Sequence, residues 1–493
     1  MSLLQDSARP VASRKIDALP GPRGWPVLGN ALQIEPERMH AQLEGWARQH
    51  GDAFTFSILK RRFLVLSHPE TVAAVLRDRP EGFRRSTRLE QFSAEFGFLG
   101  LFSANGATWK RQRPMVLAGL DPSHIKAFFP TLIQVTGRFA NRWSRAAASG
   151  EAIDLQADLM RYTVDVTAAL AFGEDINTIE AESEQVIQAH LNQILPALFK
   201  RVFAPFPTWK YFPSEQDKAI GGHLKALHEA VQGFIARTAR QLDEQPALRD
   251  RPVNLIQAMM AARDREGSGI TEADVAGNVL TMLLAGEDTT ANTLAWMIWL
   301  LHKNPDALRQ AQAEAQAVLG GASCPSGVEQ LGQLDFIEAC AYEAMRLKPV
   351  APLIVNEALK DTVIAGIEVP ARSLVMCLMR PGGLDARNFP DPLAFDPGRW
   401  ISGSGAAAHS PSSSKRAVMP FGAGPRICPG RYLALAEIKM VMAMLLANFD
   451  IADVSTADGL EPVERLALTM FPVGLSMRLK PASAMRAAAG ADR

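Results

Sequence analysis

The stretch FGAGPRICPGRYLA, from Phe421 to Ala434, decides how this chain of 493 residues is interpreted. Three glycines and two prolines surround Cys428, which is one of only four cysteines. Glycine permits backbone conformations that other residues avoid, and proline fixes φ and removes an amide donor. We therefore expect a rigid loop that holds one sulfur atom in one place.

Three interpretations of Cys428 compete. A buried structural cysteine is the usual one. A catalytic nucleophile needs a base, and no histidine neighbours Cys428 in the sequence, although a spatial partner stays open. A thiolate metal ligand needs positive charge and backbone amides around the sulfur. Arg426 supplies the charge, and the helical pattern after the loop places a helix N-terminus, which favours an anion, near the sulfur. We favour the metal ligand.

Composition excludes several classes of protein. Apolar residues make up 47% and charged residues 21%, which is typical of a globular protein with a large core. The chain has 52 basic and 52 acidic residues, and this balance argues against nucleic-acid binding. The cysteines are scattered, which argues against a disulfide framework and favours a reducing compartment. No N-terminal apolar run suggests a signal or a membrane anchor. We expect a cytoplasmic, monomeric protein.

The order of patterns predicts one mainly α domain with minor β sheets. AFTFSIL and RRFLVLS, residues 53–67, are the clearest strands, and residues 71–304 are mostly helical. Further β-like segments lie at residues 359–381 and 466–479. We expect a flexible N-terminus over 1–18, a single domain over 19–480 with a flexible serine-rich insertion at 401–414, and a disordered tail over 481–493.

One helix is unusually long. Thr271 and Asp274 form a capping-box start, and Asn304, before a proline, marks the end. The helix between them has about 32 residues and spans roughly 50 Å. It is apolar except at AGEDTTAN, residues 285–292, so a membrane span is excluded by the acids in its middle.

The polar segment has its own chemistry. Gly286 weakens the helix, and threonine hydroxyls that bond to carbonyls one turn earlier bend helices, so we expect an opened carbonyl ladder with room for a small ligand and a water. Asp288 beside Thr289 would form a short proton path. The alternative is a solvated patch on a surface helix, which the flanking apolar runs oppose.

Glu343 and Arg346 lie three residues apart on a predicted helix and share a face. Such a pair is commonplace at surfaces and contributes little there. It gains significance only from its position between the long helix and the cysteine loop. A buried pair would need a further partner, for which Arg399 in FDPGRW is our candidate.

The motifs together resemble the cytochromes P-450. FGAGPRICPG matches every fixed position of that family's haem-ligand loop, and AGEDTT resembles its oxygen-activating helix segment. Glu343 and Arg346 resemble its Glu-x-x-Arg pair, which Arg399 would complete. The spacing Trp109-x-x-x-Arg113 resembles a segment of the helix that contacts the haem propionates in this family. The likeness covers nearly the whole chain, and the motifs occur in the family's order. Because no membrane anchor is seen, the protein resembles the soluble, bacterial-type members of the family.

This resemblance implies a fold with a helix-rich lobe and a small β-rich region, with haem b between the long central helix and the cysteine-loop helix. Cys428 would be the axial ligand of the iron, and Asp288 and Thr289 would deliver protons to oxygen. The other residues implied to bind the haem are Arg426, Trp109, Arg113, Phe421, Gly424 and Gly430. We expect Gly424 and Gly430 to let amides approach the sulfur.

The implied reaction inserts one atom of O2 into a C–H or C=C bond of a lipophilic substrate. Electrons from NAD(P)H would arrive through a separate reductase with a ferredoxin or flavodoxin, because the chain shows no flavin unit or iron–sulfur cysteine cluster. A peroxide-using or rearranging haem-thiolate enzyme is the first alternative, which the acid–alcohol pair opposes. A haem sensor or carrier is the second, and it would not need AGEDTT.

Substrate and partner surfaces are predicted less directly. Arg84, Arg85 and Arg88 offer a carboxylate anchor for substrate, and basic residues near Trp109 offer a docking face for an acidic partner, with Lys110 and Arg111 as its free cations and Arg431 beside them. Positions that resemble the family's pocket segments are apolar and could equally be core: Leu101, Phe102, Phe199, Phe203, Leu284, Ala285, Leu353, Ile354, Met470 and Phe471.

Overall fold

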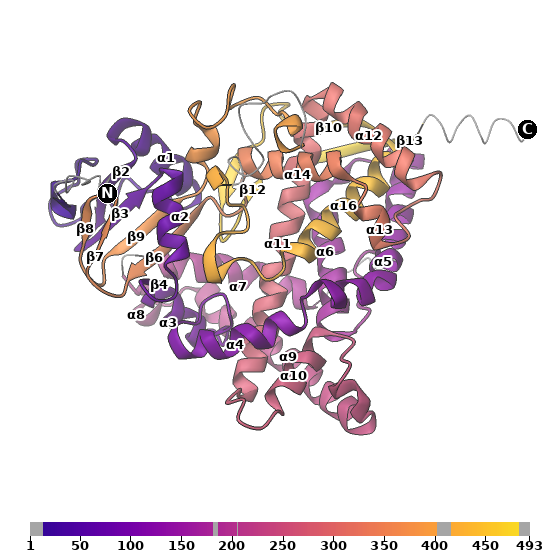
Figure 1. Ribbon diagram of the computed structural model, residues 1–493, viewed down its shortest axis with the longest axis horizontal. Helices are drawn as coiled ribbons and strands as arrows, with labels where there is room; N and C mark the ends of the chain where they lie inside the picture. Colours follow the sequence, from indigo (N-terminus) through magenta and orange to yellow (C-terminus); the bar gives the residue numbers. More distant parts are fainter. Residues whose placement is uncertain (1–12, 181–185, 205, 402–415, 483–493) are drawn as a thin grey trace, which may run out of the picture.

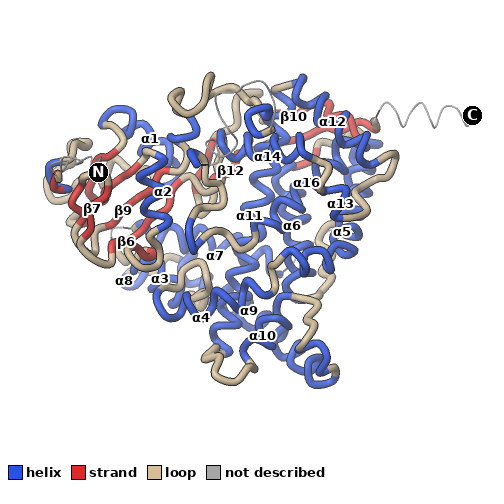
Figure 2. The backbone as a smooth tube through the Cα atoms, in the orientation of Figure 1, coloured by secondary structure: helices blue, strands red, loops and turns tan. Residues whose placement is uncertain are grey.

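A computed structural model of the chain describes residues 13–180, 186–204, 206–401 and 416–482. Helices dominate these residues (Figures 1 and 2). Their bounds are α1 Met39–His50, α2 Pro69–Arg77, α3 Thr87–Glu95, α4 Gly106–Ala118, α5 Pro122–Ser149, α6 Leu155–Phe172, α7 Val186–Phe203, α8 Thr208–Tyr211, α9 Glu215–Glu244, α10 Leu255–Arg263, α11 Glu272–Lys303, α12 Pro305–Leu319, α13 Val328–Leu331, α14 Asp335–Leu347 and α16 Arg431–Asn448.

The strands form small sheets. Their bounds are β1 Arg14–Lys15, β2 Ala53–Ile58, β3 Arg61–Leu66, β4 Phe83–Arg85, β5 Ile153–Asp154, β6 Leu353–Ala358, β7 Thr362–Ile364, β8 Ile367–Val369, β9 Leu374–Leu378, β10 Phe449–Ser455, β11 Glu464–Leu466, β12 Met470–Pro472 and β13 Ser476–Pro481. The largest sheet has the order β2-β3-β9-β6-β4, in which β3 and β9 are parallel. It joins the two β-like zones that lie about 300 residues apart in the sequence.

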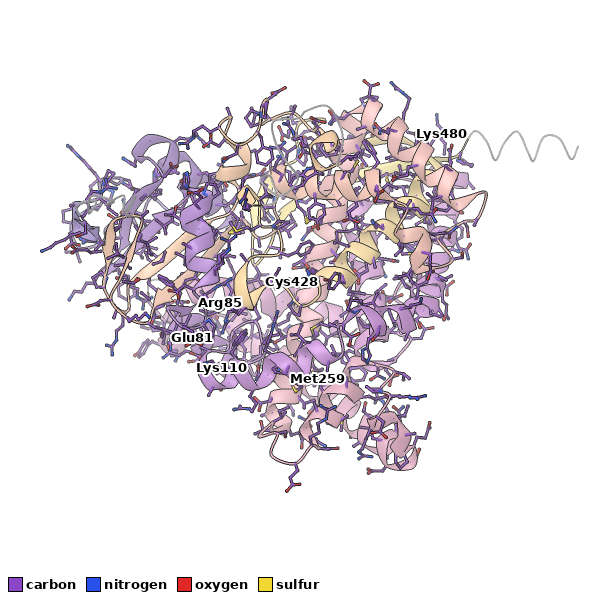
Figure 3. The ribbon with its side chains drawn as sticks, viewed as in Figure 1. Glu81, Arg85, Lys110, Met259, Cys428 and Lys480 are labelled. Atoms are coloured by element: carbon purple, nitrogen blue, oxygen red, sulfur yellow. The ribbon has the colours of Figure 1, made fainter. Side chains whose placement is uncertain are left out.

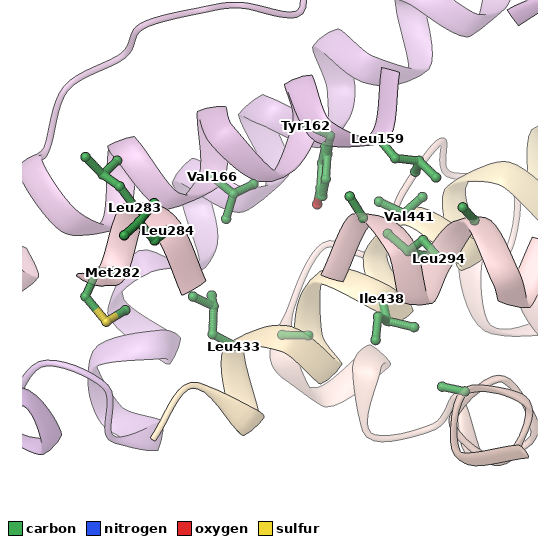
Figure 4. Close-up of a cluster of buried hydrophobic side chains, with 14 of the residues drawn as sticks. Leu159, Tyr162, Val166, Met282, Leu283, Leu284, Leu294, Leu433, Ile438 and Val441 are labelled. Carbon is green, nitrogen blue, oxygen red and sulfur yellow. The ribbon is translucent and has the colours of Figure 1, made fainter. Parts of the chain in front are cut away.

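The sheet region and the helical region lie side by side, with α11 running through the centre of the helical part (Figure 1). Helix α11 packs along α6 and contacts α14 and α16. Figure 4 shows where α6, α11 and α16 meet, and Tyr162, Leu294 and Val441 from these three helices belong to one buried apolar cluster. A helix that is apolar on most faces is stable only when other helices cover it. The predicted mainly α fold is confirmed.

The ends of α11 follow the local sequence. The Thr271 hydroxyl accepts from the Asp274 amide at 3.1 Å, and the Asp274 carboxylate accepts from the Thr271 amide at 2.9 Å, which completes the capping box. The helix then continues without interruption to Lys303. The expected opening near Gly286 is therefore not seen. A Cβ at Gly286 would lie 2.5 Å from Oγ1 of Thr167 on α6, so this glycine permits close helix packing.

The chain termini differ from the sequence-based boundaries. Arg14 and Lys15 pair with β8, and residues 16–18 form a short 3-10 helix, so part of the segment expected to be a flexible N-terminus has secondary structure. Pro481 belongs to β13, opposite Phe449, and therefore not to the tail. Apart from Ile401, the predicted insertion at 401–414 lies outside the described residues. Within the part of the chain that the structure describes, no helix is long and apolar enough to cross a bilayer.

Candidate active site

A cavity of about 300 Å³ lies between α11, the cysteine loop and the start of α4. Arg85 and Cys428, which both line it, lie near the middle of the molecule where the sheet region meets the helices (Figure 3). The residues that line it include several predicted from sequence: Leu101, Phe102, Trp109, Arg113, Ala285, Thr289, Ile354, Phe421, Arg426, Cys428 and Gly430. The structure thus brings together motifs that are spread over more than 300 residues.

The cysteine loop has a closed backbone conformation that depends on its glycines. The Cys428 amide donates to the Phe421 carbonyl at 2.9 Å and closes the loop. Gly422 and Gly424 have φ values of 74° and 71°, which glycine adopts without strain. A Cβ at Gly424 would lie 2.7 Å from the Arg77 Cα at the end of α2. Gly424 therefore allows the loop to approach α2, whereas the amide beside the Cys428 sulfur is that of Gly430.

The surroundings of Cys428 have opposing effects on its thiol. Burial is the largest effect and raises the pKa, while the Gly430 amide and the charges of Arg113 and Arg431 lower it. The sequence argument had assigned the favourable charge to Arg426, but that guanidinium points elsewhere. The Gly430 amide, however, has the predicted place beside the sulfur.

Three arginines form the most unusual feature of the cavity wall. Arg79, Arg85 and Arg426 all line it. Removal from water lowers the pKa of each, to about 10 for Arg79 and Arg426, and the nearby charge of Arg79 lowers the pKa values of Arg85 and Arg426 further. Arg426 donates to the Ala104 carbonyl and to Asn105 Oδ1. Among the described residues, Nη1 of Arg79 and the Nε atoms of Arg85 and Arg426 have no hydrogen-bond partner. Orphaned cationic donors in a cavity indicate a site for an anionic ligand.

Two residues of α4 complete this wall. The Trp109 ring lies under the Arg426 guanidinium, whose Cζ is 4.9 Å from the ring centroid. Arg113 donates to the Ile427 carbonyl in the cysteine loop at 2.7 Å, and both α4 residues line the cavity. The pair identified from sequence therefore meets the cysteine loop directly.

These groups fit a haem. The cavity offers one sulfur donor at Cys428, a cationic wall that suits the two haem carboxylates, and apolar side chains from α11 and the residues after α14. Arg79 and Arg85 were not assigned to this wall from sequence. The sequence predicts a substrate anchor from Arg84, Arg85 and Arg88. Of these three, only Arg85 lines the cavity, and the side chains of Arg84 and Arg88 point away from it. Arg84 lies near Glu90 and Glu357, and Arg88 lies over the Phe92 ring.

The polar segment of α11 is only partly in the cavity. Thr289 lines it, and its hydroxyl donates to the Ala285 carbonyl at 2.8 Å, as expected for a threonine that bonds back along its helix. Asp288 is not among the lining residues. Burial raises its pKa to about 6, so the carboxyl can take up and release a proton near neutral pH. Glu287 and Asn292 are buried, which excludes the solvated surface patch.

A second buried acid lines the cavity beneath this segment. Burial raises the pKa of Glu437, on α16, to about 8, and a hydrogen bond from the Thr290 side chain opposes the shift. Sequence analysis missed this residue, because a single glutamate in an apolar helix looks like an exposed position. The run MVMAMLL at residues 440–446 is apolar at every position, which indicates a helix buried on all faces, and this was the available signal.

The Glu343–Arg346 pair is fully buried, and Arg399 joins it as predicted. Arg346 donates to both carboxylate oxygens of Glu343 at 2.8 and 2.7 Å, and Nε of Arg399 lies 3.3 Å from Oε1. The Trp400 indole N–H also donates to Glu343 at 2.8 Å. Arg346 further donates to the carbonyls of Gly383, Pro392 and Ala394. The cluster fastens α14 to the loops that precede the cysteine.

The residues predicted for the apolar pocket divide into those that line the cavity and those that do not. Leu101, Phe102, Ala285 and Ile354 line the cavity, and Met282 and Val350 are lining residues that the sequence did not single out. Others lie elsewhere, because their elements turn them toward the core or other surfaces; of the described side chains these are Phe199, Leu284, Leu353, Met470 and Phe471. The side chain of Phe203 is outside the described set.

Comparison with known proteins places this geometry in a family. A family model, described as cytochrome P450, matches residues 19–477. The chain is similar to the chloroplastic cytochrome P450 97B2 of Glycine max, with 27% identity over 90% of this chain and 83% of that protein. It is also similar to a flavonoid 3'-monooxygenase of Oryza sativa subsp. japonica, with 28% identity over 93% and 90% of the two chains.

A third relative is the mitochondrial 25-hydroxyvitamin D-1 alpha hydroxylase of Mus musculus, with 26% identity over 92% of this chain and 91% of that protein. Among solved structures, the crystal structure of the cytochrome P450DA heme domain has a TM-score of 0.82. It covers 96% of this chain and 99% of that chain at 22% identity, so the likeness concerns the fold.

Proposed function

The chain belongs to the cytochrome P450 family and is therefore a haem-thiolate monooxygenase, and we propose that it oxidises an apolar organic molecule of medium to large size. The enzyme carries haem b and receives electrons from NAD(P)H through a redox partner. The observation that carries the substrate proposal is the cavity itself. It combines Cys428 with a wall of Leu101, Met282 and Ile354.

We assign the haem site to this chain's own residues. Cys428 would bind the iron, with the Gly430 amide beside its sulfur. Arg79, Arg85 and Arg426 would bind the haem carboxylates, because their orphaned donors and mutual repulsion call for negative charge. When bound, a haem with a thiolate ligand supplies the activation of O2. The protein supplies position, charge and exclusion of water.

Trp109 and Arg113 support this site from α4. Trp109 holds the Arg426 guanidinium over its ring, and Arg113 holds the cysteine loop through the Ile427 carbonyl. Phe421 lines the cavity within the loop, whereas Gly424 acts through its packing on α2. Glu343, Arg346 and Arg399 are structural, since none of them lines the cavity.

Proton delivery is assigned to Asp288 and Thr289. A carboxyl with a pKa near 6 exchanges protons with solvent at neutral pH without large cost. Thr289 lines the cavity, and its hydroxyl donates to the Ala285 carbonyl. When the hydroxyl rotates away from this carbonyl, it can donate a proton to a ligand in the cavity. Because Thr289 lines the cavity and Asp288 does not, the proposed path leads from the Asp288 carboxyl to the Thr289 hydroxyl and from there into the cavity.

The redox partner is proposed to be a ferredoxin or flavodoxin that docks near the cysteine loop. The predicted docking cations change, because Arg111 donates to both carboxylate oxygens of Asp274 at 3.0 and 3.1 Å and is committed there. Lys110 stays exposed, with Nζ 2.9 Å from the equally exposed Glu81 (Figure 3). Lys110 and Arg431 are therefore the cations that we assign to docking. We further propose that the enzyme acts in the cytoplasm as a monomer.

The test is a substrate screen on the haem-loaded protein. Fatty acids, terpenoids and steroids are titrated while the haem spin-state band is recorded, and compounds that bind are then incubated with O2, NAD(P)H and a ferredoxin–reductase pair. We expect spin-state shifts and products heavier by one oxygen atom. Binding confined to small polar compounds would contradict the apolar-substrate proposal. Product formed with peroxide alone, and not with reductant and O2, would favour the reductase-free alternative.

A further inference from the structure

One wall of the cavity is a loop rather than a helix. Residues 98–105, which we call the strap, connect the segment after α3 to the start of α4. Leu101 and Phe102 project from the strap into the cavity lining. Loops are usually the most mobile parts of a protein, so a loop that forms a cavity wall needs a reason to stay in place.

The strap is fastened to α11 by one buried amide. The Leu101 backbone N–H donates to Oδ1 of Asn278 at 2.8 Å, and Nδ2 of Asn278 donates to the Asp274 carbonyl at 2.7 Å. Asn278 is only 1% exposed. The oxygen of the Asn278 side-chain amide is therefore bonded to the strap, and its nitrogen is bonded to its own helix. Because the amide is buried, water cannot easily replace either hydrogen bond.

Two glycines bring the strap close enough for this bond. A Cβ at Gly100 would lie 2.1 Å from the Thr281 hydroxyl and 2.5 Å from the Gly277 carbonyl. A Cβ at Gly277 would lie 2.8 Å from the Leu99 carbonyl. The backbones of strap and helix therefore touch directly, and any larger residue at either position would separate them.

The other end of the strap is tied to the arginine wall. Arg426 donates to the Ala104 carbonyl, and the Arg85 amide donates to Oδ1 of Asn105 at 3.0 Å. The Arg85 guanidinium also lies over the Phe102 ring, with Cζ 4.8 Å from the centroid. The strap thus spans the cavity from α11 to the cationic wall, and Leu101 and Phe102 lie between its two anchors.

We propose that Asn278 is a positioning residue that locks the strap as a permanent wall, so that Leu101 and Phe102 limit the size of the ligand next to the haem. This inference rests on the proposed function, because it assigns size selection to the same site. Selection by a fixed wall differs from selection by a loop that closes over the substrate. In the fixed case the strap is protected from exchange before any ligand binds.

The test uses two readouts on the haem-loaded protein. Hydrogen exchange of the peptide that contains residues 98–105 measures whether the strap is held. Titration with imidazole, 4-phenylimidazole and a biphenyl-substituted imidazole measures size selection, because each ligand binds the iron and red-shifts the main haem band. In Asn278→Ala we expect roughly tenfold faster exchange of the Leu101 amide, the scale of one lost hydrogen bond.

In the same variant we expect discrimination between the biphenyl ligand and imidazole to relax by roughly tenfold, while the affinity for imidazole itself is unchanged. Gly100→Ala reaches the same end by a different route, since the added methyl group must lift the strap from Thr281. It keeps the proposal testable if Asn278→Ala does not fold.

Asn292→Ala is the control for the loss of a buried asparagine, and Gly100→Ala is the variant that releases the strap while leaving Asn278, which lines the cavity, in place. The control also removes a buried asparagine from α11, but Asn292 bonds to Thr469 and Gln156 and does not line the cavity. In the control we expect wild-type exchange of the strap and wild-type size selection. Unprotected strap amides in the wild-type protein, or unchanged selection in both test variants, would overturn the proposal. Absence of any red shift in the wild-type protein would instead refute the haem site on which the proposed function rests.

Discussion

Replacing Glu343 by alanine should destabilise the whole domain. The carboxylate is fully buried and holds Arg346 through two hydrogen bonds, while the Trp400 indole and the Asp396 amide donate to it as well. Its removal leaves the Arg346 guanidinium buried without its counter-charge. Breaking a buried ion pair in this way typically costs about 3–5 kcal/mol.

That loss is large relative to the free energy of unfolding of a typical domain, about 5–15 kcal/mol. The three carbonyls that accept hydrogen bonds from Arg346 do not reduce this cost, because they satisfy its N–H donors but do not neutralise its charge. Glu343→Gln also removes the counter-charge but keeps the shape and one acceptor oxygen, so we expect a smaller loss, near the lower end of the range for a broken ion pair, at about 3 kcal/mol. The order wild type, Gln, Ala in stability is the expected result.

The measurement is urea unfolding of the haem-loaded proteins, followed by far-UV circular dichroism, with haem content recorded after purification. Asp335→Asn is the control, since Asp335 lies on the same helix and is exposed. We expect it to change the free energy of unfolding by less than about 1 kcal/mol. Glu343→Ala protein with normal haem content and a wild-type midpoint would refute the reasoning.

Four further outcomes are expected. Cys428→Ser should lose the strongly red-shifted band of the reduced carbon monoxide complex, and an unchanged band would mean that another residue binds iron. Thr289→Ala should keep haem and substrate binding but form less product per NAD(P)H consumed; wild-type coupling would remove Thr289 from the mechanism. Burial raises the pKa of Glu437 to about 8, so the native state keeps a proton that the unfolded chain releases above its usual pKa of 4.5. Stability should therefore fall by about 1.4 kcal/mol per pH unit as pH rises between these values, and Glu437→Gln should flatten this dependence in pH-resolved urea unfolding; an unchanged slope would contradict the assignment. Lys110→Glu should slow reduction by an acidic ferredoxin several-fold at low salt but not reduction by dithionite, and salt-independent rates would place docking elsewhere.

The elements that local sequence specifies were predicted well. The ends of α11 follow from Thr271, Asp274 and Asn304, because a cap is an interaction between residues one turn apart. Strands β2 and β3 follow from alternation in AFTFSIL and RRFLVLS. The parallel pairing of β3 with β9 was not predictable, since no local pattern indicates which distant strand fills a sheet position.

Residue identity at the site was predictable where a motif fixes it, and less so where packing decides the direction of a side chain. Cys428 and Thr289 occupy the cavity as expected. Arg111 and Lys110 are neighbouring basic residues that look alike in the sequence. Arg111 nevertheless points inward and binds Asp274, because α4 passes the N-terminus of α11. Phe199 and Phe471 resembled pocket residues only in hydrophobicity, which core residues share.

The arginine wall shows why the haem and the fold depend on each other. The charge of Arg79 lies close enough to lower the pKa values of Arg85 and Arg426, and each of the three retains at least one donor without a partner among the described residues. Such an arrangement opposes folding of the empty protein, because buried like charges repel and unpaired donors lose their water. Two carboxylates placed among the three guanidiniums would reverse the sign of both effects. A ligand that binds only the folded state adds its binding free energy to stability, so we expect the residues that weaken the empty protein to make its stability depend strongly on haem.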